Sequence, residues 1–339
     1  MVSQRVKTLN IAALVLIIFV VGLGAFTRLV DAGLGCPDWP GCYGHLTWPV
    51  EASDIARAEA VYPDTPVDHD KTWPEMVHRY FAGALLVLVL AIAVSIWRDP
   101  PSSGIKALAS VLLGLIICQA AFGAWTVTLK LWPQVVTAHL LGGFTTFSLL
   151  WVMFLRQSGA PQLQLLAADK RALKPHAVLA LIVVALQIAL GGWVSSNYAA
   201  LACADFPTCF GTYAPSMDVA HGFNLFQSVG PNYLGGLMES EGRVAIHWFH
   251  RLGALVVLAV VLPLALRLWK YNRVLGLLLL TVLTLQLVLG VLNVVWNLPL
   301  AVATAHNGVG ALLLLAVVTV NFAPAAQEMH RRSNEPLSR

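Results

Sequence analysis

The stretch GAFTRLVDAGLGCPDWPGCYG at residues 24–44 occurs again, in altered form, as GGWVSSNYAALACADFPTCFG at residues 191–211. The two copies are offset by 167 residues, and in each copy a second cysteine follows six residues after the first. Further pairs repeat at this offset: Gln119 with Gln286, Gly123 with Gly290, and TAHLLGG (137–143) with TAHNGVG (304–310). HRYFAGALLVL (78–88) matches HRLGALVVLAV (250–260) at an offset of 172, so the second of the intervening loops is five residues longer. The chain therefore consists of two homologous halves.

The composition puts both halves in a membrane. Of the 339 residues, 58% are hydrophobic and 11% are charged, which excludes an ordinary soluble domain. A membrane-spanning helix needs about 20 apolar residues, and eight runs qualify: 10–30, 76–97, 106–128, 134–155, 176–196, 244–268, 274–296 and 301–322. We predict an all-α integral membrane protein whose eight transmembrane helices form two homologous four-helix bundles in tandem, as a parallel repeat.

Charge predicts the orientation. The loops at 31–75 and 197–243 carry 13 of the 17 acidic residues, whereas 14 of the 21 basic residues lie on the other side. By the positive-inside rule that basic side is cytoplasmic; its residues are Arg5, Lys7, Arg98, Lys106, Arg156, Lys170, Arg171, Lys174, Arg267, Lys270, Arg273, Arg331, Arg332 and Arg339. Both termini are therefore predicted inside, with two long loops outside. The net charge of +4 reflects this sorting and gives no indication of nucleic-acid binding.

The predicted domains follow from the repeat. We predict an N-terminal bundle at 1–160, a cytoplasmic linker at 161–175 and a C-terminal bundle at 176–339. The first apolar run is too long for a secretory signal and no small-residue cleavage site follows it, so we expect it to be retained. These features indicate a multi-pass protein of a bacterial-type inner (cytoplasmic) membrane, in contact with lipid.

Four of the ten histidines recur as pairs, His78 with His250 and His139 with His306. Each lies near the outer end of its predicted helix, so each half offers two imidazoles at one depth on alternate helices. Two neutral imidazoles facing each other across a flat macrocycle are what bis-histidine ligation of haem iron requires. A lone membrane histidine more often makes an interhelical hydrogen bond, but the duplicated pattern, with small residues on the intervening helices, favours haem.

Charged residues accompany the first histidine of each pair. Arg79 and Arg251 directly follow His78 and His250, and a guanidinium group can hold a haem propionate through bidentate bonds. The alternative is that both arginines extend to lipid head groups.

The two halves differ at one nearby position. Glu75 lies three residues before His78, so both project from one helix face, whereas the second half has His247 at the equivalent position. This difference suggests that the first half carries out chemistry and the second transfers electrons. The alternative is an acidic residue at a helix N-terminus, favoured by the helix dipole.

Taken together, ExxHR at 75–79, HWFHR at 247–251, the two TAH histidines and the duplicated eight-helix pattern resemble the haem A synthase family over essentially the whole chain. The resemblance implies an oxidoreductase that converts a ring methyl group of haem O to a formyl group by successive hydroxylations, making haem A for cytochrome oxidase. Attack on an unactivated methyl C–H bond needs a strong oxidant, which no side chain provides, so the iron would supply it.

The resemblance also implies roles for individual residues. His250 and His306 would be axial ligands of a resident haem b in the C-terminal half. His78 and His139 would flank the substrate haem O in the N-terminal half, with Glu75 as the catalytic acid beside it. His247 receives no role. Haem O synthase and cytochrome oxidase assembly factors are the partners this implies, while the electron donor and the oligomeric state, a homo-oligomer included, stay open.

Four cysteines form two pairs in the outer loops, Cys36 with Cys42 and Cys203 with Cys209. The outer side permits oxidation and each pair closes a small loop; the resemblance also implies such pairs. Zinc is the alternative, but CPDWPGC lacks the usual close spacing and no histidine partner repeats with it. We expect two disulfides and leave open whether they are structural or relay electrons.

Two other classes of function fit part of the pattern. A b-type electron-transfer subunit, such as that of a quinol or ferric reductase, would explain four histidines but gives Glu75 no role and needs no unequal halves. A transporter built from repeated bundles would hold its polar groups near the midplane, whereas here they lie toward the outer edge.

Overall fold

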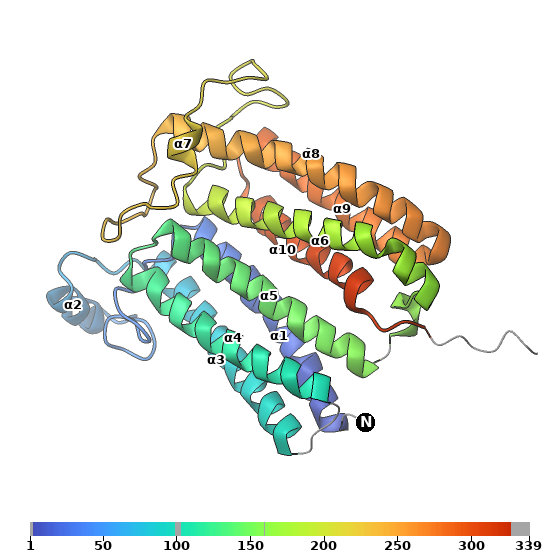
Figure 1. Ribbon diagram of the computed structural model, residues 1–339. Coiled ribbons are helices and arrows are strands. Elements are labelled where there is room, and N and C mark those ends of the chain that lie inside the picture. The colour runs from blue at the N-terminus through green and yellow to red at the C-terminus, as the bar shows by residue number, and fades with distance from the viewer. Residues whose placement is uncertain (1–2, 99–102, 159, 327–339) are drawn as a thin grey trace, which may run out of the picture.

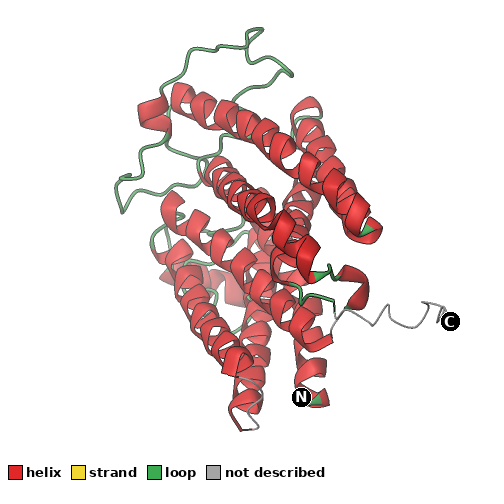
Figure 2. Ribbon diagram, turned by 45° about the vertical axis from the view of Figure 1, so that its right-hand side comes forward, coloured by secondary structure: helices red, strands yellow, loops and turns green. Residues whose placement is uncertain are grey.

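The computed structural model describes residues 3–98, 103–158 and 160–326, and this part of the chain contains helices and no β-strand (Figures 1 and 2). Eight helices are long and apolar enough to cross a membrane. They are α1 (Gln4–Leu29), α3 (His69–Arg98), α4 (Ser103–Thr128), α5 (Pro133–Ser158), α6 (Ala167–Ser196), α8 (Ser240–Tyr271), α9 (Arg273–Val295) and α10 (Leu300–Phe322). Three short pieces join them: α2 (Ala52–Val61), α7 (Val219–Gly222) and the 3₁₀ turn η1 (Pro161–Leu163). The predicted all-α membrane fold with eight spanning helices is confirmed.

The physical reason for long helices is the lack of water in a bilayer. Every backbone N–H and C=O group must be bonded within the protein, and a helix does this within one segment. The apolar runs therefore fold as helices, and the polar stretches between them form the turns. Asn272 is the single residue between α8 and α9. Its side chain accepts a hydrogen bond from the Leu275 N–H at 3.1 Å and so caps the N-terminus of α9.

The helices pack as two rings of four. In the first half, α1 contacts α3 and α5, and α4 contacts the same two helices; in the second half, α6 and α9 each contact α8 and α10. The halves meet where α5 lies against α6 and where α10 lies against α1 and α5 (Figure 1). This arrangement is consistent with two bundles in tandem.

The backbone repeats along with the sequence. Nine residues other than glycine have a positive φ among those described, and eight of them form four pairs at the 167-residue offset: Asp31 with Tyr198, Tyr43 with Phe210, Lys130 with Asn297, and Leu131 with Leu298. A positive φ is uncommon for such residues, so shared positions mean that the turns after corresponding helices have the same shape. The duplication is thus present in the turns as well as in the helices.

All eight spanning helices begin earlier than the hydropathy predicted, α1 at Gln4 rather than 10, and three of the shifts affect the site or the predicted linker. α3 begins at His69 rather than 76, α8 at Ser240 rather than 244, and α6 at Ala167, inside the stretch predicted as a linker. The added turns are polar, so an apolar window does not detect them. As a consequence His78 lies nine residues into α3 and His250 ten residues into α8, further from the helix starts than the predicted runs at 76–97 and 244–268 place them.

The site-bearing end of the molecule is the end with the long loops. The loops containing α2 and α7 lie at the same end of the helices, and the N-terminus lies at the other (Figure 1). The large apolar core fills the helices and contains Ile17, Ile96, Leu150, Leu264 and Leu268. Smaller clusters beneath the loops are built around the cysteine pairs. Three of the basic residues used to predict the orientation, Arg331, Arg332 and Arg339, lie outside the described residues.

Candidate functional site

Each of the four repeated histidines packs against a glycine on a neighbouring helix. A Cβ atom placed on the glycine would lie 3.0 Å from His78 Nε2 at Gly24, 3.5 Å from His139 Cε1 at Gly123, 3.2 Å from His250 Cε1 at Gly191, and 3.2 Å from His306 Cε1 at Gly290. The first, third and fourth of these separations are closer than ordinary contact. The four glycines therefore leave the space that the imidazole rings occupy.

The two histidines of each half lie on helices of the same four-helix ring, His78 with His139 and His250 with His306. The members of each pair come from different helices, α3 with α5 and α8 with α10. In each ring these two helices contact the same two neighbouring helices; that the two imidazoles cooperate in binding haem stays a prediction.

The imidazole nitrogens have few protein partners. In the second half, Gln187 Nε2 lies 3.2 Å from Nδ1 of His250, and Gln286 Nε2 lies 3.3 Å from Nε2 of His306. In the first half, no hydrogen bond to either imidazole is found among the described residues. His139 Nδ1 and His306 Nδ1 are buried without a partner. Buried polar atoms are nearly always bonded, so these nitrogens indicate that something beyond the protein's own groups belongs here.

These observations fit a haem in each half. Each site has two imidazoles, a neighbouring helix surface from which side chains are missing, and a nitrogen that no protein group bonds. Such a donor set suits haem iron, for which histidine is a common axial ligand. Clusters of three or more His, Cys, Asp or Glu able to hold a bare metal ion are absent from the described residues.

Glu75 is buried, with 4% of its surface exposed, and both of its carboxylate oxygens accept hydrogen bonds. The Cys36 N–H donates to Oε2 at 2.9 Å, and Arg79 donates to Oε1 at 2.5 Å. Arg79 also donates to the carbonyl of Asp38 at 2.9 Å and to that of Gly41. The carboxylate is thus fixed between the first disulfide loop and the turn of α3 that carries His78.

His247 has the same contacts in the second half. The Cys203 N–H lies 3.2 Å from its Nδ1, and Arg251 Nε lies 3.2 Å from its Nε2. Arg251 donates as well to the carbonyls of Thr208 at 2.8 Å and Cys203 at 2.7 Å. His247, for which no role was predicted, is the structural counterpart of Glu75, and it connects its loop to α8 without a carboxylate.

Arg79 and Arg251 both donate hydrogen bonds to backbone carbonyls of the disulfide loops. The prediction was a different contact, in which the two arginines bind haem propionates. The loop carbonyls satisfy guanidinium donors that would otherwise be buried and unpaired. Propionate binding by these two residues stays a prediction.

The predicted disulfides are confirmed. Cys36 and Cys42 are bonded with Cα atoms 4.7 Å apart, and Cys203 and Cys209 with Cα atoms 4.9 Å apart. Each disulfide loop also contains an aspartate two residues after its first cysteine, Asp38 in one loop and Asp205 in the other. Each aspartate accepts hydrogen bonds from the backbone N–H groups of the two residues that follow the loop's second cysteine. For Asp205 these donors are Phe210 at 2.6 Å and Gly211 at 2.9 Å.

The aspartate of the second loop stays charged in strong acid. The hydroxyl of Thr208 and the N–H groups of Gly211 and Phe210 lower the pKa of Asp205 to about 2. Because a lowered pKa means that the charged form is favoured in the folded loop, its contribution is lost only as the pH falls through that value. The charge of Asp205, and with it the hydrogen bonds that the carboxylate accepts, is therefore present at neutral pH.

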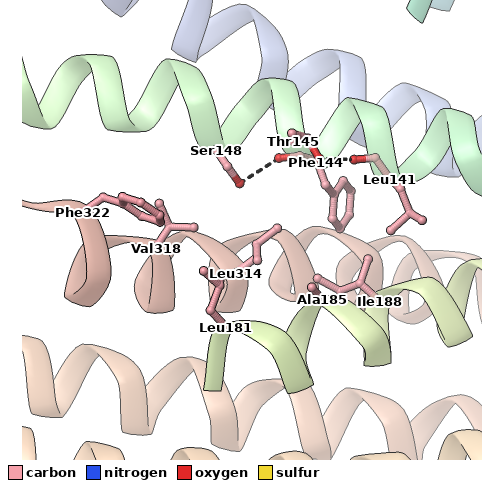
Figure 3. Close-up of a pocket in the computed structure, with 10 residues that line it drawn as sticks. All are labelled: Leu141, Phe144, Thr145, Ser148, Leu181, Ala185, Ile188, Leu314, Val318 and Phe322. Atoms are coloured by element: carbon pink, nitrogen blue, oxygen red, sulfur yellow. Dashed lines mark hydrogen bonds between the residues drawn. The ribbon is translucent and has the colours of Figure 1, made fainter. Parts of the chain in front are cut away.

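Figure 3 shows an apolar groove that is separate from this site. It has a volume of about 200 Å³ and lies between α5, α6 and α10, with Leu141, Phe144, Leu181, Leu314 and Val318 among its lining residues. The Ser148 hydroxyl in it donates to the Phe144 carbonyl of its own helix. None of the four histidines lines the groove, so it offers no ligand and no acid or base.

Some residues of the site were not predicted from the sequence. Gly24 and Gly191 are aligned by the repeat, but nothing in the sequence says that they face His78 and His250. Gln187 has no counterpart, because position 20 in the first half is Val20. The repeat could have identified the glycine pair; no signal identifies the glutamine.

Comparison with known proteins gives one consistent answer. A model of the cytochrome oxidase assembly protein family (COX15-CtaA) matches residues 7–318. A Shewanella oneidensis protein named haem A synthase is 45% identical over 313 residues, which cover 91% of this chain and 93% of that protein. Proteins with the same name from Caulobacter sp. and Rickettsia prowazekii are 30% and 23% identical, covering 90% and 91% of this chain and 91% and 94% of their own lengths.

Proposed function

The chain belongs to the COX15-CtaA family of cytochrome oxidase assembly proteins, and on this basis we propose that it is a haem A synthase, an oxidoreductase that acts on haem O. The observation that supports the proposal is the pair of imidazoles in each half, each packed on a glycine, with Glu75 one helical turn from His78 and His247 at the corresponding position of the second half. An electron-transfer subunit would need neither the carboxylate nor the difference between the halves.

The two halves have different functions. His250 and His306 hold a resident haem b in the second half, where Gln187 and Gln286 orient the two rings. His78 and His139 flank the substrate haem O in the first half. The lack of a hydrogen bond to either first-half imidazole supports this division, because a site that exchanges its haem is better served by ligands without competing partners.

The reaction needs two oxidations of one methyl group. Successive hydroxylations give a geminal diol, which loses water to become the formyl group of haem A. The oxidation removes four electrons from the methyl carbon and takes its oxygen atom from water or dioxygen; haem iron would supply the redox chemistry, with an acceptor outside the protein for the electrons.

Glu75 acts on the charge that develops at the methyl carbon or accepts the proton that is released. Cys36 and Arg79 hold its carboxylate in place, and preorganised groups of this kind need no rearrangement during the reaction.

The cell location follows from the same premise. The chain is a multi-pass membrane protein. We place it in a bacterial inner membrane with both termini in the cytoplasm, so that the disulfide loops and the outer ends of both haem sites face the oxidising side. Its product enters the cytochrome oxidase assembly pathway, and haem O synthase is the class of enzyme that supplies its substrate.

The glycines beside the histidines can be tested separately from the histidines. Gly24→Val adds a side chain where a Cβ alone would lie 3.0 Å from His78 Nε2, so we expect displacement of the imidazole and loss of most haem A production. Gly22→Val is the matched control, because this residue is on the same helix and has nothing within 4 Å. The measurement is the haem A content of membranes; equal content in the two variants would contradict the site.

The function itself is tested in cells that make haem O and lack their own haem A synthase. Expression of this chain should make haem A appear in chromatographed haem extracts, and an empty vector should leave only haem O and haem b. Haem O alone, in cells whose membranes contain the folded protein, would contradict the proposed function.

A further inference from the structure

A buried cation with an unused donor lies between the two halves at their outer end. Arg28 is on the last turn of α1, and its side chain is 17% exposed. Its guanidinium donates to the Ser195 carbonyl, pairs with Asp31 at 3.3 Å and stacks over the Tyr198 ring at 4.1 Å. Its Nε–H is buried without a partner. Nη1 and Nη2 each have a partner, and Nε is the nitrogen of this group without one.

This cation belongs to the first half only. The repeat aligns Arg28 with Ser195, so the second half has no charge at this position. Arg28 lies four residues after Gly24, the glycine that packs on His78. Residues four apart share a helix face, so Arg28 projects one turn outward from the first histidine pair.

The chemistry of the substrate calls for such a group. A haem ligated by imidazoles carries two propionate carboxylates at one edge, and these must point toward the polar end of the bundle. The two arginines that follow the ligand histidines, Arg79 and Arg251, already donate to loop carbonyls. Arg28 also donates to a carbonyl, that of Ser195, but in addition its Nε is buried without a partner.

We propose that Arg28 binds a propionate of the substrate haem in the first half, with its unpaired Nε–H as a donor. This rests on the proposed function, because it assumes that the first half binds haem O. Asp31 and Tyr198 then act as positioning residues: the Tyr198 hydroxyl donates to Asp31 at 2.8 Å, and the Tyr198 ring supports the guanidinium plane. The first half thereby distinguishes a haem with free carboxylates from one without.

The test is a titration of the purified protein, which retains its resident haem, with haem O and with haem O dimethyl ester. Binding is followed by absorbance. Wild-type protein should bind the free acid about 10- to 100-fold more tightly than the ester, the range expected for a charge-assisted bond. Arg28→Gln should lose that preference by weakening the acid alone, and its content of resident haem b should not change.

The matched control is Arg57→Gln, which removes an arginine of the outer loop whose side chain is 73% exposed; it should leave both affinities unchanged. Equal binding of acid and ester by the wild type would overturn the inference without any variant. So would loss of resident haem b in Arg28→Gln, or an equal fall for acid and ester, since both indicate a structural role. Failure of the wild type to bind haem O in either form would instead overturn the proposed function, and the inference with it.

Discussion

Replacing Glu75 with glutamine should lower haem A production by about 100- to 10,000-fold, the range for loss of a positioned acid–base group, while resident haem b stays bound. Glutamine keeps the shape, and its oxygen can still accept the Cys36 N–H. It removes the negative charge from a buried position where Arg79 and the loop fix the carboxylate. The loss should therefore reflect chemistry rather than collapse of the loop.

The measurement is a haem extraction from cells that make the variant, separated by chromatography. A haem with a single added hydroxyl should accumulate if the second oxidation depends more on the carboxylate than the first. Glu59→Gln, which alters an exposed acidic residue of the same outer loop, is the control and should leave haem A unchanged. A wild-type amount of haem A in Glu75→Gln would contradict the catalytic role. Glu75 would then only connect the first loop to α3, as His247 connects the second loop to α8.

His250→Ala and His306→Ala should each abolish the low-spin absorbance of resident haem b in the purified protein. Each change removes one of the two proposed axial ligands and leaves a cavity next to a glycine. The absorbance spectrum at known protein concentration measures the effect. His69→Ala, which alters an exposed histidine at the start of α3, is the control. A full wild-type spectrum in both ligand variants would show that the ligands lie elsewhere.

The sequence predicted most of the fold because a bilayer permits few solutions. Eight apolar runs had to become helices, and the fixed offset between the repeats identified the two halves. The helix starts at His69 and Ser240 were missed because the first turns of α3 and α8 are polar. Hydropathy detects the apolar part of a helix and gives no information on the turns that extend above it.

The candidate site was predictable where it repeats. The four histidines and the two cysteine pairs were found because each occurs twice at a corresponding position. The partners of Arg79 and Arg251 were not predictable, since they are backbone carbonyls of irregular loops. The role of His247 was hidden for a similar reason: the repeat aligns it with Glu75, but side-chain chemistry does not reveal that both contact the N–H of the first cysteine in their loop.

The central claim is that two halves with the same geometry hold different haems. It is tested most directly by extracting the bound haem from two double variants, His78→Ala with His139→Ala and His250→Ala with His306→Ala, purified from cells that make haem O. We expect the first to retain haem b and lose haem O, and the second to lose haem b. Loss of the same haem from both, or haem b missing from the first and present in the second, would contradict the division between the halves.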